Sequence, residues 1–170
     1  YVNAVLENVC DTNRRTVLKK DNASIETVEH LLAAITASDI DNIMIEVDGP
    51  EIPILDGSSK IFLDKIEKAK IVHQKKKTHK VELPNYFKVE HENSKIEFYP
   101  QNNLEIEVTI DYQSSILTPQ KAKMNDLSKF KKDISSARTF CFLHELDHLI
   151  NNNLIKGGDI NNGIVFIENE

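Results

Sequence analysis

A basic break, HQKKKTHK at residues 73–80, separates two stretches of this chain that each mix helix-like and strand-like patterns. Ahead of it, apolar residues recur at helical spacing in residues 24–37 and again in residues 59–72. Between them, residues 43–47 alternate apolar and polar side chains, and a turn-forming run with two Pro and two Gly follows. The first stretch therefore predicts a strand and a rigid loop between two helices.

The stretch beyond the break is richer in strand patterns. Residues 80–100 favour strands joined by turns, and residues 104–112 alternate as a half-buried strand with one wet face does. Helices are predicted at 126–140 and 144–154, and the Gly-rich turn within 157–167 leads into a strand. Because apolar stripes and faces must be covered by another layer, the sequence indicates an α+β or layered α/β protein.

The break also indicates how the domains are organised. A chain of 170 residues suffices for one large domain or two small ones. The change of pattern favours two, residues 1–73 and residues 79–170. The chain opens in patterned sequence at YVNAVLENV, without an initiator methionine, so we expect it to be part of a longer polypeptide.

Composition narrows the functional classes. Hydrophobic residues make up 40% and charged residues 28% of the chain, which excludes wholesale disorder. The formal net charge of −6 argues against nucleic acid as a partner, since phosphate binding needs a basic face. Cys10 and Cys141 form no C-x-x-C pair, and the chain has neither a signal-peptide pattern nor an apolar run of membrane-spanning length. We therefore expect a cytoplasmic protein without stable membrane insertion.

Glu29 and His30 are adjacent in the first predicted helix. Neighbours on a helix point about 100° apart, so both side chains can border one cleft, as a base and a metal ligand would. Adjacent Glu and His are also common by chance. Spacing alone therefore favours a structural role over a functional one.

His144, Glu145 and His148 spell H-E-x-x-H, which in metalloproteases places two histidines on zinc and a glutamate as general base. The histidines share a helix face at i, i+4, so the geometry is permissive. A catalytic zinc needs a third protein ligand, however, and the other face of FLHELDHLI is that of a packed amphipathic helix. Spacing leaves zinc ligands and surface histidines equally open.

Two further segments are candidates. Thr139 follows Arg138 in SARTF, where a helix end with the arginine tied to a carboxylate is the favoured interpretation. KGGDINNG, residues 156–163, has paired glycines that let a backbone approach a ligand closely, although a plain turn is commoner. It is not a phosphate-binding P-loop, because no G-K-[ST] follows.

These segments occur together, and in order, in one known family. Residues 27–59, which include TVEHL and PEIPILDGS, closely resemble the signature block of the UDP-3-O-acyl-N-acetylglucosamine deacetylase family, the zinc amidases of lipid A biosynthesis. Residues 137–166 resemble the family's second domain, in the form fused to a hydroxyacyl-carrier-protein dehydratase. The resemblance implies an α+β fold of two layered α/β sandwich domains with the active site between them. It also implies a Zn2+ cofactor and a UDP-linked acylated amino sugar as substrate.

The resemblance assigns roles to individual residues. The family's metal-binding histidine falls on His30, its general base on Glu29, and its oxyanion-stabilising threonine on Thr139, with Phe140 beside it. Zinc would acidify the attacking water, Glu29 would take the proton, and Thr139 would help to hold the oxyanion. The acyl-chain passage corresponds to Leu143, Leu146, Ile155, Gly158 and Ile160. The uridine-diphosphate contacts correspond to Lys95, Asp111 and Tyr112.

The resemblance also has a gap. The family completes its zinc site with an H-x-x-x-D motif and adds a histidine as general acid, and none of these lies within the chain. We therefore expect one zinc ligand of three and no deacetylation by these residues alone. In the family the helix matching HELDHL borders the acyl passage, so the H-E-x-x-H string would be coincidental. Two alternatives remain: a zinc peptidase dependent on His144 and Glu145, and a metal-free fragment whose UDP binding chelators leave unaffected.

Overall fold

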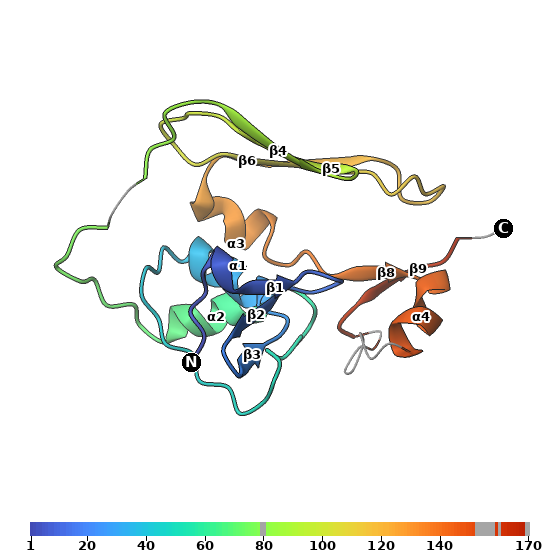
Figure 1. Ribbon diagram of the computed structural model, residues 1–170, viewed down its shortest axis with the longest axis horizontal. Coiled ribbons are helices and arrows are strands. Elements are labelled where there is room, and N and C mark those ends of the chain that lie inside the picture. The colour runs from blue at the N-terminus through green and yellow to red at the C-terminus, as the bar shows by residue number, and fades with distance from the viewer. Residues whose placement is uncertain (79–80, 152–158, 160, 169–170) are drawn as a thin grey trace.

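The computed structural model describes residues 1–78, 81–151, 159 and 161–168 (Figure 1). These residues form a mixed α+β protein, in which short helices accompany small sheets of two or three strands. The predicted α+β class is confirmed. The finer arrangement, two layered sandwich domains divided at the basic break, stays a prediction.

The first sheet is antiparallel, with strand order β1–β2–β3. A single 3-10 turn leads into it, and the bounds are η1 (Leu6–Asn8), β1 (Val9–Asp11), β2 (Val17–Lys20) and β3 (Ala23–Ile25). Leu18 of β2 pairs with Val9 on one side and Ile25 on the other, and it is buried. Figure 1 shows the connection between β1 and β2 reaching away from this sheet toward β8.

Both helices predicted in the first half are confirmed, although each is shorter than its periodic pattern. They are α1 (Glu29–Ala37) and α2 (Lys60–Lys68). Ser24 and Ile25, the first two residues of the predicted helix, belong instead to β3, because backbone pairing with β2 competes with the helix there. Two buried apolar clusters result, one of Leu18, Val28 and Ile52 and the other of Ala34, Leu63 and Phe130.

The prediction of a strand at residues 43–47 is wrong. All five side chains are exposed, and no described strand lies alongside to supply ladder hydrogen bonds. Alternation predicts two faces, whereas a strand also needs a paired neighbour. The loop that follows does make a parallel bridge: Glu26 N–H donates to Pro50 O at 2.9 Å, and Ile52 N–H donates to Glu26 O at 3.0 Å. That bridge holds the loop before α2 against the segment that leads into α1.

Two antiparallel hairpins follow the basic break. Their strands are β4 (Phe87–His91), β5 (Ser94–Phe98), β6 (Ile106–Ile110) and β7 (Gln120–Met124). The turn predicted between β4 and β5 is confirmed, with Glu92 at a left-handed φ of 49°. Ion pairs cross each hairpin or run along it, for example Lys121 to Glu107 at 2.8 Å. Apolar side chains such as Val89 and Val108 are about half exposed.

A short helix then returns the chain to the first half. It is α3 (Phe130–Asp133), which follows the 3-10 turn η2 (Leu127–Lys129). The helix predicted over residues 126–140 is wrong beyond Asp133. Ser135 ends it, because its N–H donates to Phe130 O at 2.8 Å and its hydroxyl donates to Lys131 O at 2.6 Å. Serine side chains compete in this way with helical hydrogen bonds.

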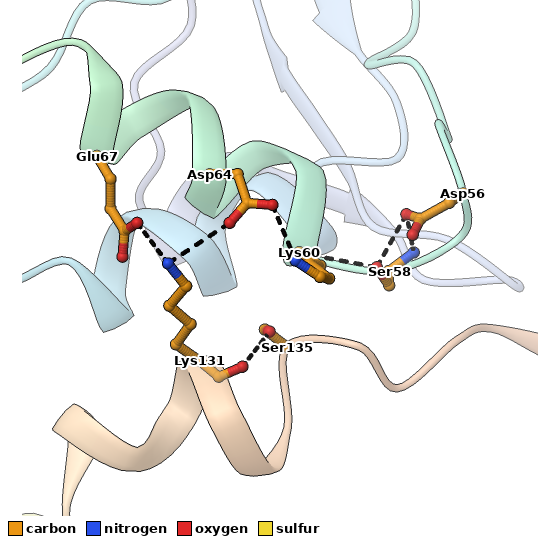
Figure 2. A network of polar contacts seen from close by, with 7 residues as sticks. All are labelled: Asp56, Ser58, Lys60, Asp64, Glu67, Lys131 and Ser135. Atoms are coloured by element: carbon orange, nitrogen blue, oxygen red, sulfur yellow. Dashed lines mark hydrogen bonds and ion pairs between the residues drawn. The ribbon is translucent and has the colours of Figure 1, made fainter.

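Packing and charge together tie α3 to α2, and Figure 2 shows the charged contacts. Phe130 is buried against the cluster between the helices. Lys131 Nζ lies 2.5 Å from Glu67 Oε2 and 3.6 Å from Asp64 Oδ1, both on α2. The segment after α3 therefore starts from a fixed point on the first half.

The last described elements form a parallel strand pair and a short helix. They are β8 (Phe140–Phe142), η3 (Leu143–Glu145), α4 (Leu146–Asn151) and β9 (Ile164–Phe166), with β8 paired to β9. The strand predicted after the Gly-rich turn is confirmed as β9. The helix predicted over residues 144–154 is confirmed from residue 146 to residue 151. Residues 144 and 145 lie instead in the 3-10 turn η3, and residues 152–154 lie outside the described residues.

Candidate functional site

The Glu29–His30 pair begins α1. Glu29 Oε2 accepts the Thr16 N–H at 3.0 Å, and Glu29 Oε1 lies 4.0 Å from His30 Nε2. The His30 side chain is 17% exposed and the Glu29 side chain 37%. A carboxylate in the first turn of a helix is also stabilised by the helix dipole. The carboxylate is thus held in one orientation while it stays open to solvent, as a general base requires.

Thr139 is fixed through its main chain. It stands between α3 and β8, and its N–H donates to Gly57 O at 2.8 Å. Its own carbonyl accepts the Ile164 N–H at 3.0 Å. The Thr139 side chain is exposed, and among the described residues its hydroxyl makes no hydrogen bond. The hydroxyl therefore stands ready for a ligand on a backbone that is anchored on both sides.

The connection between β1 and β2 links the Glu29–His30 pair to the Thr139 segment. Two residues before Thr16, Arg14 reaches across to β8, where its Nη2 donates to Phe140 O at 3.5 Å. The Arg14 guanidinium also pairs with the Glu145 carboxylate through contacts of 3.2 and 3.4 Å. One short segment therefore contacts both the candidate base and the strand that follows Thr139.

Phe140 lies in an aromatic cluster that includes one predicted substrate contact. The Tyr112 ring meets the Phe140 ring edge to face, with 5.3 Å between centroids. Phe166 meets Phe140 in the same way at 5.4 Å. Tyr112 is 49% exposed, so one side of it remains open to a ligand.

The other two predicted UDP contacts, Asp111 and Lys95, interact with residues close to them in the sequence. Asp111 Oδ1 accepts the Gln113 N–H at 2.9 Å in the segment after β6. Lys95 is on β5, where its Nζ lies 3.1 Å from Glu97 Oε2, and this hydrogen bond raises the pKa of Lys95. The described residues show no contact between Lys95 and the Glu29–His30 or Thr139 segments. Contact of these two residues with UDP stays a prediction.

The predicted acyl passage is only partly described. Leu143 is 48% exposed in η3 and Leu146 is half-buried at the start of α4. The other predicted lining residues, Ile155, Gly158 and Ile160, lie outside the described residues.

The H-E-x-x-H residues line a pocket of about 370 Å3. Its lining residues are Asn13, Arg14, His144, Glu145, His148 and Leu149. The Glu145 carboxylate is engaged there, because it pairs with Arg14 and accepts the Phe142 N–H at 2.9 Å. His144 precedes α4 and lies in the 3-10 turn, so it and His148 do not share one regular helix. These contacts favour a structural role for Glu145 over that of a general base.

Zinc would find one ligand in the described part of the site. His30 offers an imidazole nitrogen, whereas a catalytic zinc takes three protein ligands. Within the described ranges, no group of three or more His, Cys, Asp or Glu side chains could hold a metal ion. His30 therefore fits as one member of a zinc site, and its other ligands would be supplied by other residues of the protein.

Sequence reasoning missed Arg14, Thr16 and Gly57. Arg14 and Thr16 carry no pattern, because their contacts are made by an irregular connection between short strands. Gly57 could have been noticed as the glycine of the D-G-S string, since a glycine in a rigid loop often marks a close backbone approach. Its partner, Thr139, could not have been inferred from that signal.

Comparison with known proteins identifies the family. The sequence profile of the UDP-3-O-acyl N-acetylglycosamine deacetylase (LpxC) family matches residues 1–170. The chain belongs to this family. It is 39% identical over 169 residues to the bifunctional enzyme LpxC/FabZ of Bacteroides thetaiotaomicron, a match that covers 98% of this chain and 37% of that protein.

Single-function relatives match as well. The chain is 37% identical over 167 residues to the UDP-3-O-acyl-N-acetylglucosamine deacetylase of Chlamydia pneumoniae, covering 97% of this chain and 59% of that protein. For the deacetylase of Helicobacter pylori the identity is 37% over 164 residues, with 96% and 56% covered. The chain thus spans between about a third and three fifths of the length of these relatives. Among the described helices, none has the length and apolar character needed to cross a membrane.

Proposed function

We propose that the protein removes the acetyl group from UDP-3-O-(3-hydroxyacyl)-N-acetylglucosamine by zinc-dependent hydrolysis, as a cytoplasmic enzyme of lipid A biosynthesis. The observation that carries the proposal is the Glu29–His30 pair, with its carboxylate oriented by the Thr16 N–H, in a chain that matches the family over residues 1–170. A base beside a metal ligand is what amide hydrolysis at a metal centre needs.

The residues of this chain would divide the chemistry between them. Zinc bound at His30 would polarise the acetamide carbonyl and acidify the attacking water. Glu29 accepts the proton of that water as it adds to the carbonyl carbon. The C–N bond then breaks, and the departing amine takes up a proton as acetate is released. The Thr139 hydroxyl donates a hydrogen bond to the oxygen on which negative charge develops. The anchored main chain of Thr139 keeps this donor in place before charge appears, so little reorganisation is needed.

The substrate would lie along the elements around this centre. Tyr112, with Asp111 and Lys95, would contact the uridine diphosphate. Leu143 and Leu146, with the predicted passage residues that follow them, would line the path of the acyl chain. In the complete protein these elements would belong to two layered sandwich domains with the site between them.

Two proposals concern the complete polypeptide. Among the described residues His30 is the one proposed zinc ligand and no group of three ligands is present, so we propose that this chain would not deacetylate on its own. The relatives named as bifunctional LpxC/FabZ enzymes support the expectation of a fused hydroxyacyl-carrier-protein dehydratase. The mass of the native gene product tests the second proposal directly.

The deciding experiment compares His30→Ala with His144→Ala in the complete protein. Zinc content and acetate release from UDP-3-O-(3-hydroxyacyl)-N-acetylglucosamine are measured for both variants and the wild type. We expect His30→Ala to lose zinc and at least about a hundredfold in activity, because a metal ligand is gone, while His144→Ala keeps its zinc. Loss of zinc in His144→Ala instead would establish the peptidase-type site. A wild type that binds UDP equally well with and without chelator, and releases no acetate, would establish the metal-free binding protein.

A further inference from the structure

The loop before α2 contacts the main chain of Thr139 through Gly57. The Gly57 carbonyl accepts the Thr139 N–H at 2.8 Å. A Cβ atom placed on Gly57 would lie 2.0 Å from Asn162 O and 3.3 Å from Thr139 Cγ2. Gly57 also has φ +79°, a conformation that L side chains rarely adopt. The close approach of the Gly57 main chain to those of Asn162 and Thr139 therefore depends on the absence of a side chain at residue 57.

We propose that Gly57 is a positioning residue for Thr139 in the deacetylation. Its carbonyl and its missing side chain together set where the Thr139 hydroxyl stands against the reacting acetamide. The inference rests on the proposed function, since it gives Gly57 a role only through the oxyanion contact of Thr139.

The loop that presents Gly57 is held firmly. Asp56 Oδ1 accepts both the hydroxyl of Ser58 at 2.8 Å and its N–H at 3.2 Å, and Ser58 Oγ accepts the Lys60 N–H at 3.2 Å (Figure 2). Ser58 is fully buried. The Gly57 N–H donates to Ile54 O at 2.9 Å. A loop tied down in this way against the start of α2 can serve as a fixed reference.

A second contact runs parallel to the first. Arg138 Nε donates to Asp56 O at 2.8 Å, one residue before Thr139 donates to Gly57 O. The consecutive carbonyls of Asp56 and Gly57 thus accept hydrogen bonds from the consecutive residues Arg138 and Thr139. On the far side, Thr139 is paired to β9 through the Ile164 N–H. The position of Thr139 is determined by the loop and by β9 together.

The cost of a side chain at Gly57 follows from these distances. Ordinary van der Waals contact begins near 3.4 Å, so a methyl group 2.0 Å from Asn162 O must push the main chains apart by about 1 Å or more. The loop is tied to α2, so the movement falls on the segment of Asn162. Ile164, two residues further along, donates its N–H to Thr139 O, so part of the movement passes to Thr139. A displacement of about 1 Å at a catalytic group can cost about a hundredfold in rate. We expect Gly57→Ala to lower kcat by about 10- to 100-fold and to change KM by less than about twofold, because the oxyanion contact exists only in the transition state.

The experiment is a double-mutant cycle in the complete, zinc-loaded protein. Gly57→Ala and Thr139→Ala are made singly and together, and Gly49→Ala is the matched control, because a Cβ there meets nothing within 4 Å. Acetate release gives kcat and KM, while zinc content and thermal unfolding show that each variant is folded and loaded. If Gly57 acts through Thr139, its loss of kcat disappears in the Thr139→Ala background. Gly49→Ala should match the wild type throughout.

Arg138→Ala provides a second route in case Gly57→Ala does not fold. It removes the donor to Asp56 O without adding atoms, and we expect a smaller loss of kcat, about threefold to tenfold, that also disappears in the Thr139→Ala background.

Three results would overturn the inference. The first is a folded Gly57→Ala variant that keeps the kcat of the wild type. The second is a loss of kcat from Gly57→Ala that is equally large in the wild type and in the Thr139→Ala background, which would show a purely structural effect. The third is an unchanged kcat in Thr139→Ala, which would leave Gly57 nothing to position. An inactive wild type would instead overturn the proposed function, and this inference with it, so the two failures are distinguishable.

Discussion

Replacing Glu145 with alanine tests whether this residue stabilises the site or performs chemistry. Its carboxylate pairs with Arg14, 131 positions away in the sequence, and accepts the Phe142 N–H at 2.9 Å. Asp147 is the matched control, because it is an exposed carboxylate two residues further along. A structural Glu145 predicts a loss of stability that the control does not share.

The magnitude follows from burial. The Glu145 and Arg14 side chains are 28% and 37% exposed, so their ion pair contributes about 0.2–1 kcal/mol. Phe142 is 7% exposed, and a charge-assisted hydrogen bond from its N–H contributes about 1.5–3 kcal/mol. Glu145→Ala should therefore destabilise by about 2–4 kcal/mol and Arg14→Ala by about 1 kcal/mol or less.

Thermal unfolding of the complete protein provides the assay. A change of 1 kcal/mol moves Tm by about 2–4 °C for a domain of this size, so Glu145→Ala should lower Tm by about 4–16 °C. Asp147→Ala should stay within about 1–2 °C of the wild type, as exposed substitutions usually do. The reasoning is refuted if Glu145→Ala keeps the Tm of the wild type but loses zinc or activity, since Glu145 would then act chemically.

Two titratable groups provide further tests. Partial burial raises the pKa of the Cys141 thiol, whereas Cys10 is exposed. Iodoacetamide at neutral pH should therefore alkylate Cys10 several times faster than Cys141, as peptide mass mapping would show. Equal rates would contradict the shielding of Cys141. The hydrogen bond from Lys60 holds the pKa of Asp64 below its ordinary 3.8. The ionised carboxylate therefore contributes stability above pH 3.8, and that contribution is lost as pH falls through the lower folded value. NMR titration should show the Asp64 pKa rising in Lys60→Met, and an unchanged value would rule out Lys60 as the cause.

Local patterns predicted the elements whose stability is local. The 3.6-residue period located α1 and α2, because an apolar stripe on a helix can be read from sequence alone. The hairpin of β4 and β5 was recognised because its turn residues and its alternating strands are adjacent. Residues 43–47 show the limit of this reasoning, since the pattern contains no information on whether a neighbouring strand is present.

The candidate site depends on contacts that no local pattern reports. Glu29 and His30 were found through the family resemblance, because an adjacent Glu–His pair is common by chance. The contact of Arg14 with Glu145 joins an irregular connection to a short 3-10 turn, and it arises only once both halves have folded. The pairing of Gly57 with Thr139 likewise crosses between the halves. This pairing also explains why the predicted helix does not continue through Thr139, because the Thr139 N–H donates to the Gly57 carbonyl instead of to a helical carbonyl.

The H-E-x-x-H string shows how surroundings decide the meaning of a motif. A zinc ion held by His144 and His148 would share their pocket with the Arg14 guanidinium. Like charges at such short range repel strongly when they are partly shielded from water. The Glu145 carboxylate is already paired with Arg14, which leaves Glu168, 3.7 Å from His144, to offset a second cation. At α1, His30 lies beside the Glu29 carboxylate, whose negative charge favours a bound cation. The Arg14 guanidinium therefore supports the proposal that His30 is the zinc ligand, although His144 and His148 carry the better-known pattern.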